Sequence, residues 1–211
     1  MNIVIFGAGG RAGRHLVAEA TRRGHTVTAV VRDPSRHRDL PPAARVAAGD
    51  VTDETAVERL AAGHEVAISA AVDLSGSPHD FFTTSTRALT EGLRKAGVHR
   101  LLVVGLASVL PGPSGTLLMD EPGYPNEYRP FYLAHAAGLA LLRTSTTPDL
   151  TWTYAAPAGD FDHEGTPVGR YRVAKHGDAN DRITYADFAV GLLDEAEGGG
   201  RGGGVVSFGG A

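Results

Sequence analysis

The 211-residue sequence contains no cysteine. This absence excludes disulfide bonds, thiolate zinc sites and cysteine nucleophiles, and it fits a reducing cytoplasm, which is the expected location. Redox chemistry in this chain would therefore need a cofactor. The nine histidines form no H-x-H or H-E-x-x-H pair and have no carboxylates around them at metal-ligand spacing, so we expect no metal site.

Positive charge and long apolar runs are also scarce. The formal net charge is −4 and the 20 Lys and Arg residues are scattered, so no basic stripe is available for a nucleic-acid backbone. The opening segment, Met1 to Gly7, has no basic region, and its apolar run is too short for a signal peptide or a membrane span. We expect a soluble monomer or homodimer with no nucleic-acid or membrane partner.

Short apolar runs alternate with longer helical patterns, which is typical of βαβ units and of a parallel sheet buried on both faces. With 42% apolar residues, the chain can close one sizeable core. We therefore predict one Rossmann-type α/β domain over residues 1–211, with a doubly wound, mostly parallel sheet and helices on both faces. The predicted strands are Asn2–Phe6, Thr26–Val31, Arg45–Ala48, Glu65–Ala70, Arg100–Gly105, Leu150–Ala155 and Val205–Phe208. The predicted helices are Arg11–Arg23, Asp53–Ala62, Pro78–Ala96, Glu127–Thr144 and Thr184–Glu197, and Gly198–Gly204 is predicted to be a surface loop.

A glycine-rich run follows the first predicted strand at once and opens the first predicted helix. It reads as G-x-x-G-x-x-G through Gly7, Gly10 and Gly13, or as G-x-G-x-x-A through Gly7, Gly9 and Ala12. In this context glycines allow a tight turn and let backbone N–H groups approach a pyrophosphate. The run predicts a dinucleotide site at Gly7, Gly9, Gly10, Arg11, Ala12 and Gly13. A strand-to-helix turn without a ligand is the alternative.

The end of the second predicted strand bears on the choice of dinucleotide. Arg32 stands where a guanidinium can pair with a 2′-phosphate, which favours NADP(H) over NAD(H). The alternative is that Arg32 is solvated and Asp33 accepts from the ribose, which would give NAD(H). Small residues after the next two strands suit close approach to the adenosine half, and we expect contacts there from Asp50, Val51, Ser69, Ala70 and Ala71.

Several runs along nearly the whole chain resemble the NADH-flavin reductase-like family, a branch of the atypical short-chain dehydrogenases related to biliverdin reductase B. The resemblance rests on Gly7–Gly13, Val31–Asp33, Ala96–Val98, Leu101–Gly105, Asn126–Pro130, Asp149–Thr153, Ala156–Ala158, Gly169–Arg172 and Arg182–Ala189. It implies an NAD(P)H-dependent reductase of a flavin or another planar acceptor, with FMN or FAD as substrate rather than prosthetic group. The stretch from Val109 to Asn126 is rich in proline and glycine, and we expect the loop 106–126 and the segment 156–180 to form the acceptor site. Leu106, Ala107, Pro157 and Ala158 are expected to contact the cofactor.

A standard short-chain dehydrogenase carries a Tyr and a Lys four residues later, and that pair is missing. The fourth residue after Tyr132 is Ala136, and His135 is the ionisable group nearby. Hydride transfer to a flavin needs no strong general acid. The missing Tyr and Lys pair therefore favours a flavin-like acceptor over a simple ketone.

Three residues remain as catalytic candidates: Ser108, His135 and Tyr132. Ser108 matches the serine at the nicotinamide end of the biliverdin reductase B type, although it would also suit the start of a loop. The ordinary pKa of histidine, near 6.5, lets His135 contact the nicotinamide ribose or supply a proton, and a structural hydrogen bond is the alternative. Tyr132 is expected to stack on the acceptor together with Phe131 and Tyr124, unless these rings serve packing alone.

Two other functions fit the missing Tyr and Lys. One is a non-catalytic NADP(H)-sensing regulator similar to the NmrA-like proteins. The other is a specialised biosynthetic enzyme, an isomerase or dehydratase on the same fold.

Overall fold

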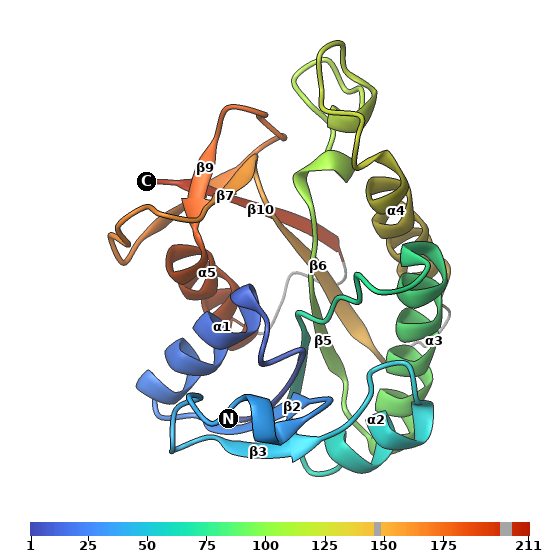
Figure 1. Cartoon of the computed structure of the whole chain (residues 1–211), viewed down its shortest axis with the longest axis vertical. Helices are drawn as coiled ribbons and strands as arrows, with labels where there is room; N and C mark the ends of the chain where they lie inside the picture. The colour runs from blue at the N-terminus through green and yellow to red at the C-terminus, as the bar shows by residue number, and fades with distance from the viewer. Residues whose placement is uncertain (146–148, 199–203) are drawn as a thin grey trace.

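A mostly parallel, eight-stranded sheet forms the centre of the computed structural model, which describes residues 1–145, 149–198 and 204–211 (Figure 1). The strand order is β3-β2-β1-β4-β5-β6-β10-β8, and only β8 runs antiparallel, against β10. The strands are β1 (Asn2–Phe6), β2 (Thr26–Val31), β3 (Arg45–Ala48), β4 (Val66–Ser69), β5 (Arg100–Val104), β6 (Thr151–Pro157), β8 (Tyr171–Ala174) and β10 (Gly204–Gly210). A separate parallel pair is formed by β7 (Asp160–Asp162) and β9 (Arg182–Thr184).

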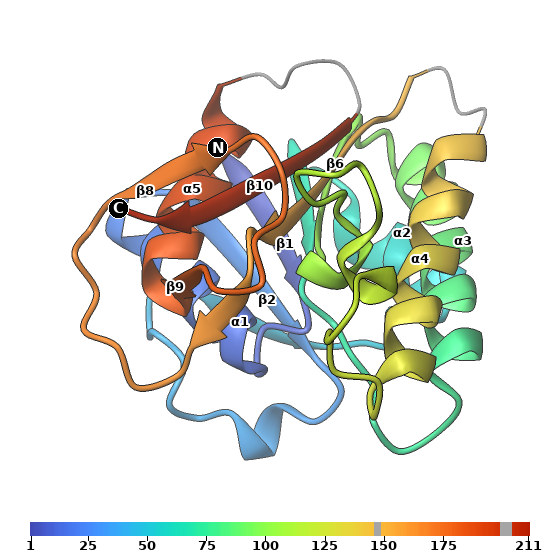
Figure 2. The same cartoon turned by 90° about the horizontal axis from the view of Figure 1, so that it is seen from above.

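Helices cover both faces of this sheet (Figures 1 and 2). One face carries α1 (Arg11–Arg22) and α5 (Tyr185–Glu197), and the other carries α2 (Glu54–Ala61), α3 (Pro78–Ala96) and α4 (Arg129–Thr144). Short 3-10 turns are η1 (Pro34–Arg36), η2 (Ala107–Val109) and η3 (Leu118–Asp120). The layers are those of a doubly wound fold, whose ligand crevice lies at the carboxyl ends of the strands.

Burial on both faces explains why the central strands read as continuous apolar runs. Along β1, Ile3 and Ile5 pack toward α1 and α5, whereas Val4 and Phe6 pack toward α2 and α3, and all four are fully buried. Side chains of a strand alternate between its faces, so two cores need apolar residues at every position.

Local signals set the helix ends. The hydroxyl of Ser77 accepts a hydrogen bond from the N–H of Asp80 at the start of α3, and Pro78 is its first residue. Gly97, with φ of +71°, ends the same helix in the left-handed conformation. Thr184 caps α5 by accepting from the N–H of Asp187.

The predicted sheet with helices on both faces is confirmed, and the strand and helix bounds agree to within two residues. Three strands were not predicted: β7, β8 and β9. β7 and β9 have three residues each, and β8 is an edge strand whose Arg172 and Val173 are exposed, so none of them has an apolar run. Within the predicted loop Gly198–Gly204, residues 199–203 lie outside the described residues.

Close packing of α3 on α2 gives a test of the fold. A Cβ on Gly92 would lie 2.8 Å from Cγ1 of Val57 and 2.9 Å from the carbonyl oxygen of Glu54. We expect Gly92→Ala to lower the free energy of unfolding by about 1–3 kcal/mol in urea titrations, despite the higher helix propensity of alanine. Gly138→Ala in α4 is the matched control, because its nearest contact is the rotatable Thr86 hydroxyl at 3.3 Å. Equal stability of the two variants would contradict the packing argument.

Candidate functional site

The turn between β1 and α1 is built by backbone contacts that leave no room for side chains. Gly7 has φ of +75°, and a Cβ there would lie 2.5 Å from the backbone of Ala71. A Cβ on Gly13 would lie 2.2 Å from the carbonyl oxygen of Gly7. These two positions therefore require glycine, and α1 rests directly on the turn.

Four backbone N–H groups of this turn are free. Those of Gly9, Arg11, Ala12 and Gly13 have no hydrogen bond to any part of the chain that the structure describes. Gly10 caps α1 without a side chain, so these donors stay open at the positive end of the helix. Such donors suit an anion, above all a phosphate.

A cavity of about 320 Å³ lies beside the free N–H groups, at the carboxyl ends of β1, β2 and β4. It brings together eight of the predicted binding residues: Gly7, Gly9, Gly10, Arg32, Asp50, Val51, Ala70 and Ala71. Asp33, Arg36 and His37, together with Phe81 from α3, complete much of its wall. The glycine cradle, the open donors and the cavity fit the pyrophosphate and adenosine half of a dinucleotide.

The basic side chains of the wall are anchored by neighbours. Nη1 of Arg32 donates to Oδ2 of Asp73 at 2.9 Å, while 64% of the Arg32 side chain stays exposed. His37 packs against Gly9 and meets Arg14, whose Nε donates to the carbonyl oxygen of Gly9 at 2.8 Å. Positive charge therefore stands on the β2 side of the cavity.

The carboxylate of Asp33 is held in a local turn. Its Oδ1 accepts from the N–H of Ser35 at 3.0 Å and from the Ser35 hydroxyl at 2.7 Å, and these hydrogen bonds lower the pKa of Asp33. Asp33 is thus the N-cap of η1.

Arg36, His37 and Phe81 were not predicted as residues of the cavity wall. The basic run from Arg32 to Arg38 offered a signal for the first two, because it follows the second strand directly. Nothing in the sequence around Phe81 indicated that it lines the cavity, apart from its position near the start of a predicted helix.

Eight predicted binding residues lie outside this cavity: Arg11, Ala12, Gly13, Ser69, Leu106, Ala107, Pro157 and Ala158. Nη1 of Arg11 contacts Nδ1 of His163 at 3.0 Å, which links the start of α1 to the segment 156–180. Pro157 and Ala158 are buried, and the N–H of Ala158 donates to the carbonyl oxygen of Phe208. Their roles toward a cofactor stay predictions.

Ser108 is the middle residue of η2, which follows β5. Ser108 is 1% exposed, and its hydroxyl oxygen has no hydrogen-bond partner among the described residues. A buried hydroxyl without a partner is costly, and a ligand or water that meets it removes that cost.

His135 is buried in α4, with 6% of its surface exposed. Its Nδ1 lies 3.1 Å from the hydroxyl of Tyr154, and its ring packs on Phe82 with centroids 3.9 Å apart. Burial lowers the pKa of His135 to about 3, so the ring is neutral at physiological pH. Desolvation therefore removes the ordinary pKa that was expected of His135, and its role toward a ligand stays a prediction.

The expected stacking residues form edge-on pairs. The ring centroids of Tyr124 and Tyr132 lie 5.6 Å apart, and Phe131 meets His135 edge-on at 4.9 Å. Burial raises the pKa of Tyr124 to about 12 and also raises that of Tyr132. Both phenols are thus protonated at neutral pH, and their role toward an acceptor stays a prediction.

The two segments expected at the acceptor site lie against each other. The N–H of Gly177 donates to the carbonyl oxygen of Pro111 at 2.8 Å and joins the two segments. Within the segment 156–180, the N–H of Asp178 donates to the carbonyl oxygen of Ala158 at 2.8 Å. The buried carboxylate of Asp187 accepts from the N–H groups of Val168 and Gly169. These bonds fasten the segment 156–180 to the loop 106–126 and to α5.

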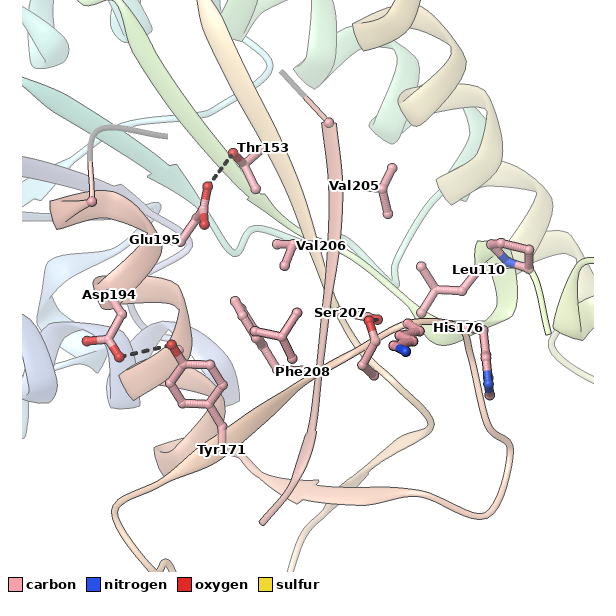
Figure 3. A pocket seen from close by; sticks show the side chains of 17 residues that line it. Leu110, Thr153, Tyr171, His176, Asp194, Glu195, Val205, Val206, Ser207 and Phe208 are labelled. Atoms are coloured by element: carbon pink, nitrogen blue, oxygen red, sulfur yellow. Dashed lines mark hydrogen bonds between the residues drawn. The ribbon is translucent and has the colours of Figure 1, made fainter. Parts of the chain in front are cut away.

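A larger cavity, of about 490 Å³, lies around β10 and α5 (Figure 3). Its wall includes Thr153, Tyr171 and Asp194, and it shares no residue with the cavity at the phosphate turn. Leu110, Pro111 and the stretch from Val173 to His176 line it, so both segments expected to form the acceptor site reach this cavity, although none of the individually predicted binding or catalytic residues does. Of these two cavities, the smaller one is lined by glycines of the phosphate turn.

Over residues 1–145, 149–198 and 204–211, no group of three or more His, Asp or Glu residues is arranged to hold a metal ion. Within the same residues, no helix has the length and apolar character that crossing a bilayer requires.

Comparisons with known proteins match nearly the whole chain. A family model described as NAD(P)H-binding covers residues 7–196. The Bacillus subtilis protein YwnB is 35% identical over 204 residues, which make up 93% of this chain and 92% of that protein. A Streptomyces protein named 3-diazoavenalumate denitrifying reductase is 33% identical, over 99% of this chain and 67% of its own length.

A solved structure of similar sequence comes from Streptococcus pneumoniae and is described as a "putative NADH-flavin reductase". It is 32% identical, aligns over 100% of both chains and has a TM-score of 0.87. The extent of the family match, together with the cavity at the glycine-rich turn, shows that the chain belongs to the NAD(P)H-binding oxidoreductase family.

Proposed function

We propose that this protein is an NADPH-dependent reductase that delivers hydride to a flavin or a similar planar conjugated acceptor. The observation that carries the proposal is the cavity at the phosphate turn, which is lined by Gly9 with its free N–H and by Arg32 with its exposed guanidinium. The free N–H groups of Arg11, Ala12 and Gly13 follow directly in the chain. When bound, the nicotinamide supplies the hydride. The role of the protein is then to bind, orient and shield the two partners.

The preference for NADPH rests on the charges at the end of β2. Arg32 and Arg36 line the cavity on the side where the adenosine ribose is expected, and they suit a 2′-phosphate. Asp33, the residue that would accept from a free ribose hydroxyl, already binds Ser35 with one carboxylate oxygen. This arrangement favours the phosphorylated dinucleotide.

The acceptor class rests on the missing pair of Tyr and Lys in α4. Ala136 replaces the lysine partner of Tyr132, burial keeps His135 neutral, and Tyr132 and Tyr124 hold their protons firmly. Hydride transfer to a conjugated ring tolerates this, because the remaining proton comes from solvent. Ser108 supplies a neutral hydroxyl that orients the nicotinamide or the acceptor. The proposal needs no partner beyond these small molecules, in a cytoplasmic monomer or homodimer.

Replacement of Arg32 tests the cofactor preference. We expect Arg32→Ala to weaken NADPH binding about 10- to 100-fold while NADH binding changes little, because a charge-assisted pair with the phosphate is lost. Calorimetry with both dinucleotides measures this. Arg22→Ala is the control, since Arg22 is equally exposed on α1 and pairs with Glu19. An unchanged NADPH to NADH ratio in Arg32→Ala would contradict the proposed phosphate contact.

Turnover tests the reaction itself. We expect the wild-type protein to oxidise NADPH with FMN, and Ser108→Ala to lower kcat about tenfold at unchanged NADPH affinity, because a hydrogen bond at the reacting end is lost. A quinone and an aryl diazo compound serve as further acceptors, the latter because of the name of the Streptomyces relative. Thr90→Val, which removes a buried hydroxyl within α3 and away from both segments of the expected acceptor site, is the control. NADPH binding without turnover of any of these acceptors would argue against a reductase.

The neutral state of His135 has a measurable effect on stability. The unfolded chain binds a proton at this residue below about pH 6.5, whereas the native pKa is about 3. Protonation therefore favours the unfolded state, and the free energy of unfolding falls as pH decreases from 6.5 toward 3, by up to about 1.4 kcal/mol per pH unit. In His135→Gln this contribution disappears, so its urea stability should fall less steeply between pH 6.5 and 4. Parallel curves for both proteins would mean that the native ring takes up protons.

A further inference from the structure

The hydroxyl of Tyr154 joins two segments that are far apart in the sequence. Tyr154 lies in β6 and is 1% exposed. Its oxygen accepts from the N–H of Leu106 at 3.1 Å and lies 3.1 Å from Nδ1 of His135. The ring reaches this point by passing over Gly105, where a Cβ would lie 2.0 Å from the ring carbon Cε1.

The hydrogen-bond count at this hydroxyl decides the position of the histidine proton. The Leu106 N–H is a donor, so the Tyr154 oxygen accepts there and its own proton must find a different acceptor. Among the described residues, Nδ1 of His135 is the only acceptor in contact with it. An unsatisfied buried hydroxyl proton would cost about 1–3 kcal/mol, so Tyr154 donates to Nδ1.

A ring nitrogen that accepts carries no proton, and burial keeps the imidazole neutral. The single ring proton therefore resides on Nε2. In the described parts of the chain, Nε2 has no hydrogen-bond partner, so this N–H is free to donate to a ligand.

We propose that Tyr154 is a positioning residue that fixes His135 as its Nε2–H tautomer, and that this neutral N–H donates to a polar atom of the acceptor or the nicotinamide. The contacts around the ring support a fixed orientation, because Phe82 and Phe131 pack on it at centroid distances of 3.9 and 4.9 Å. Among the described residues, Tyr154 is the only titratable residue that packs against the His135 ring or forms a hydrogen bond with it.

The same hydroxyl holds the turn that carries Ser108. Leu106 caps η2, Ser108 is the central residue of that turn, and η2 packs against α4. One buried hydroxyl thus aligns two groups without partners, the Nε2–H of His135 and the hydroxyl of Ser108. The inference that both groups meet one ligand rests on the proposed function. The assignment of the His135 tautomer does not depend on that function.

The tautomer can be measured in the ligand-free protein by two-bond ¹H–¹⁵N correlation of labelled histidine rings, with the signals of His135 identified by their loss in His135→Gln. We expect a protonated Nε2 and an unprotonated Nδ1, unchanged between pH 5 and 8. In Tyr154→Phe, Nδ1 loses its donor, so the signals should shift toward a mixture of tautomers. Thr90→Val is the matched control, because it removes a buried hydroxyl that donates to the carbonyl oxygen of Arg87 within α3, and it should leave His135 unchanged.

A protonated Nδ1 or a charged ring in the wild-type protein overturns the assignment, and this outcome does not depend on whether Tyr154→Phe folds. Kinetics then tests the role in the reaction. We expect Tyr154→Phe to lower kcat with FMN about tenfold while the NADPH dissociation constant stays within about twofold, and Thr90→Val to change neither. An unchanged kcat in a variant whose tautomer has shifted overturns the positioning role.

Failure of the proposed function has a different signature. If no acceptor is reduced, the ring signals still decide the tautomer. Addition of NADP⁺ or FMN then tests the donor: a shift of the His135 Nε2–H signal on binding supports the contact, and binding without any shift overturns it.

Discussion

The approach of Gly13 to the carbonyl oxygen of Gly7 fixes the position of α1 on the sheet, because no side chain separates helix and turn. The N–H groups of Gly7 and Ala8 both donate to the carbonyl oxygen of Val30, which holds the turn against β2 as well. The free N–H of Gly9 in the turn and the charge of Arg32 at the end of β2 consequently border one cavity. Any side chain at residue 13 would move α1 outward and separate these groups.

The parts of this architecture that the sequence predicts are those with a local cause. Strands buried on both faces are mostly apolar and rich in β-branched residues, so β1 and β2 could be placed to the residue. Gly7 and Gly13 could be identified because only glycine fits a turn of this kind. Arg32 could be identified because it directly follows the second strand, whose register with β1 places its end beside the phosphate turn. That position puts Arg32 in the cavity wall.

The features that escaped prediction depend on contacts between distant residues. Nothing near His135 in the sequence reveals that Tyr154 and Phe82 bury its ring, so its lowered pKa could not be anticipated. Arg36 and His37 face the cavity only because η1 turns the chain back toward Gly9. The short strands β7 and β9 arise from pairing with each other, which no apolar pattern records.

The place of β10 in the sheet has a consequence for how the chain reaches this state. β10 lies between β6 and β8, and within the described residues β8 pairs with β10 alone. During synthesis β8 leaves the ribosome before its neighbour exists, so the segment around it stays without a sheet partner until residues 204–210 emerge. The wall of the larger cavity, which includes residues of both β8 and β10, can therefore form only after β10 has been synthesised. The phosphate turn, in contrast, is built on the first strands to be made.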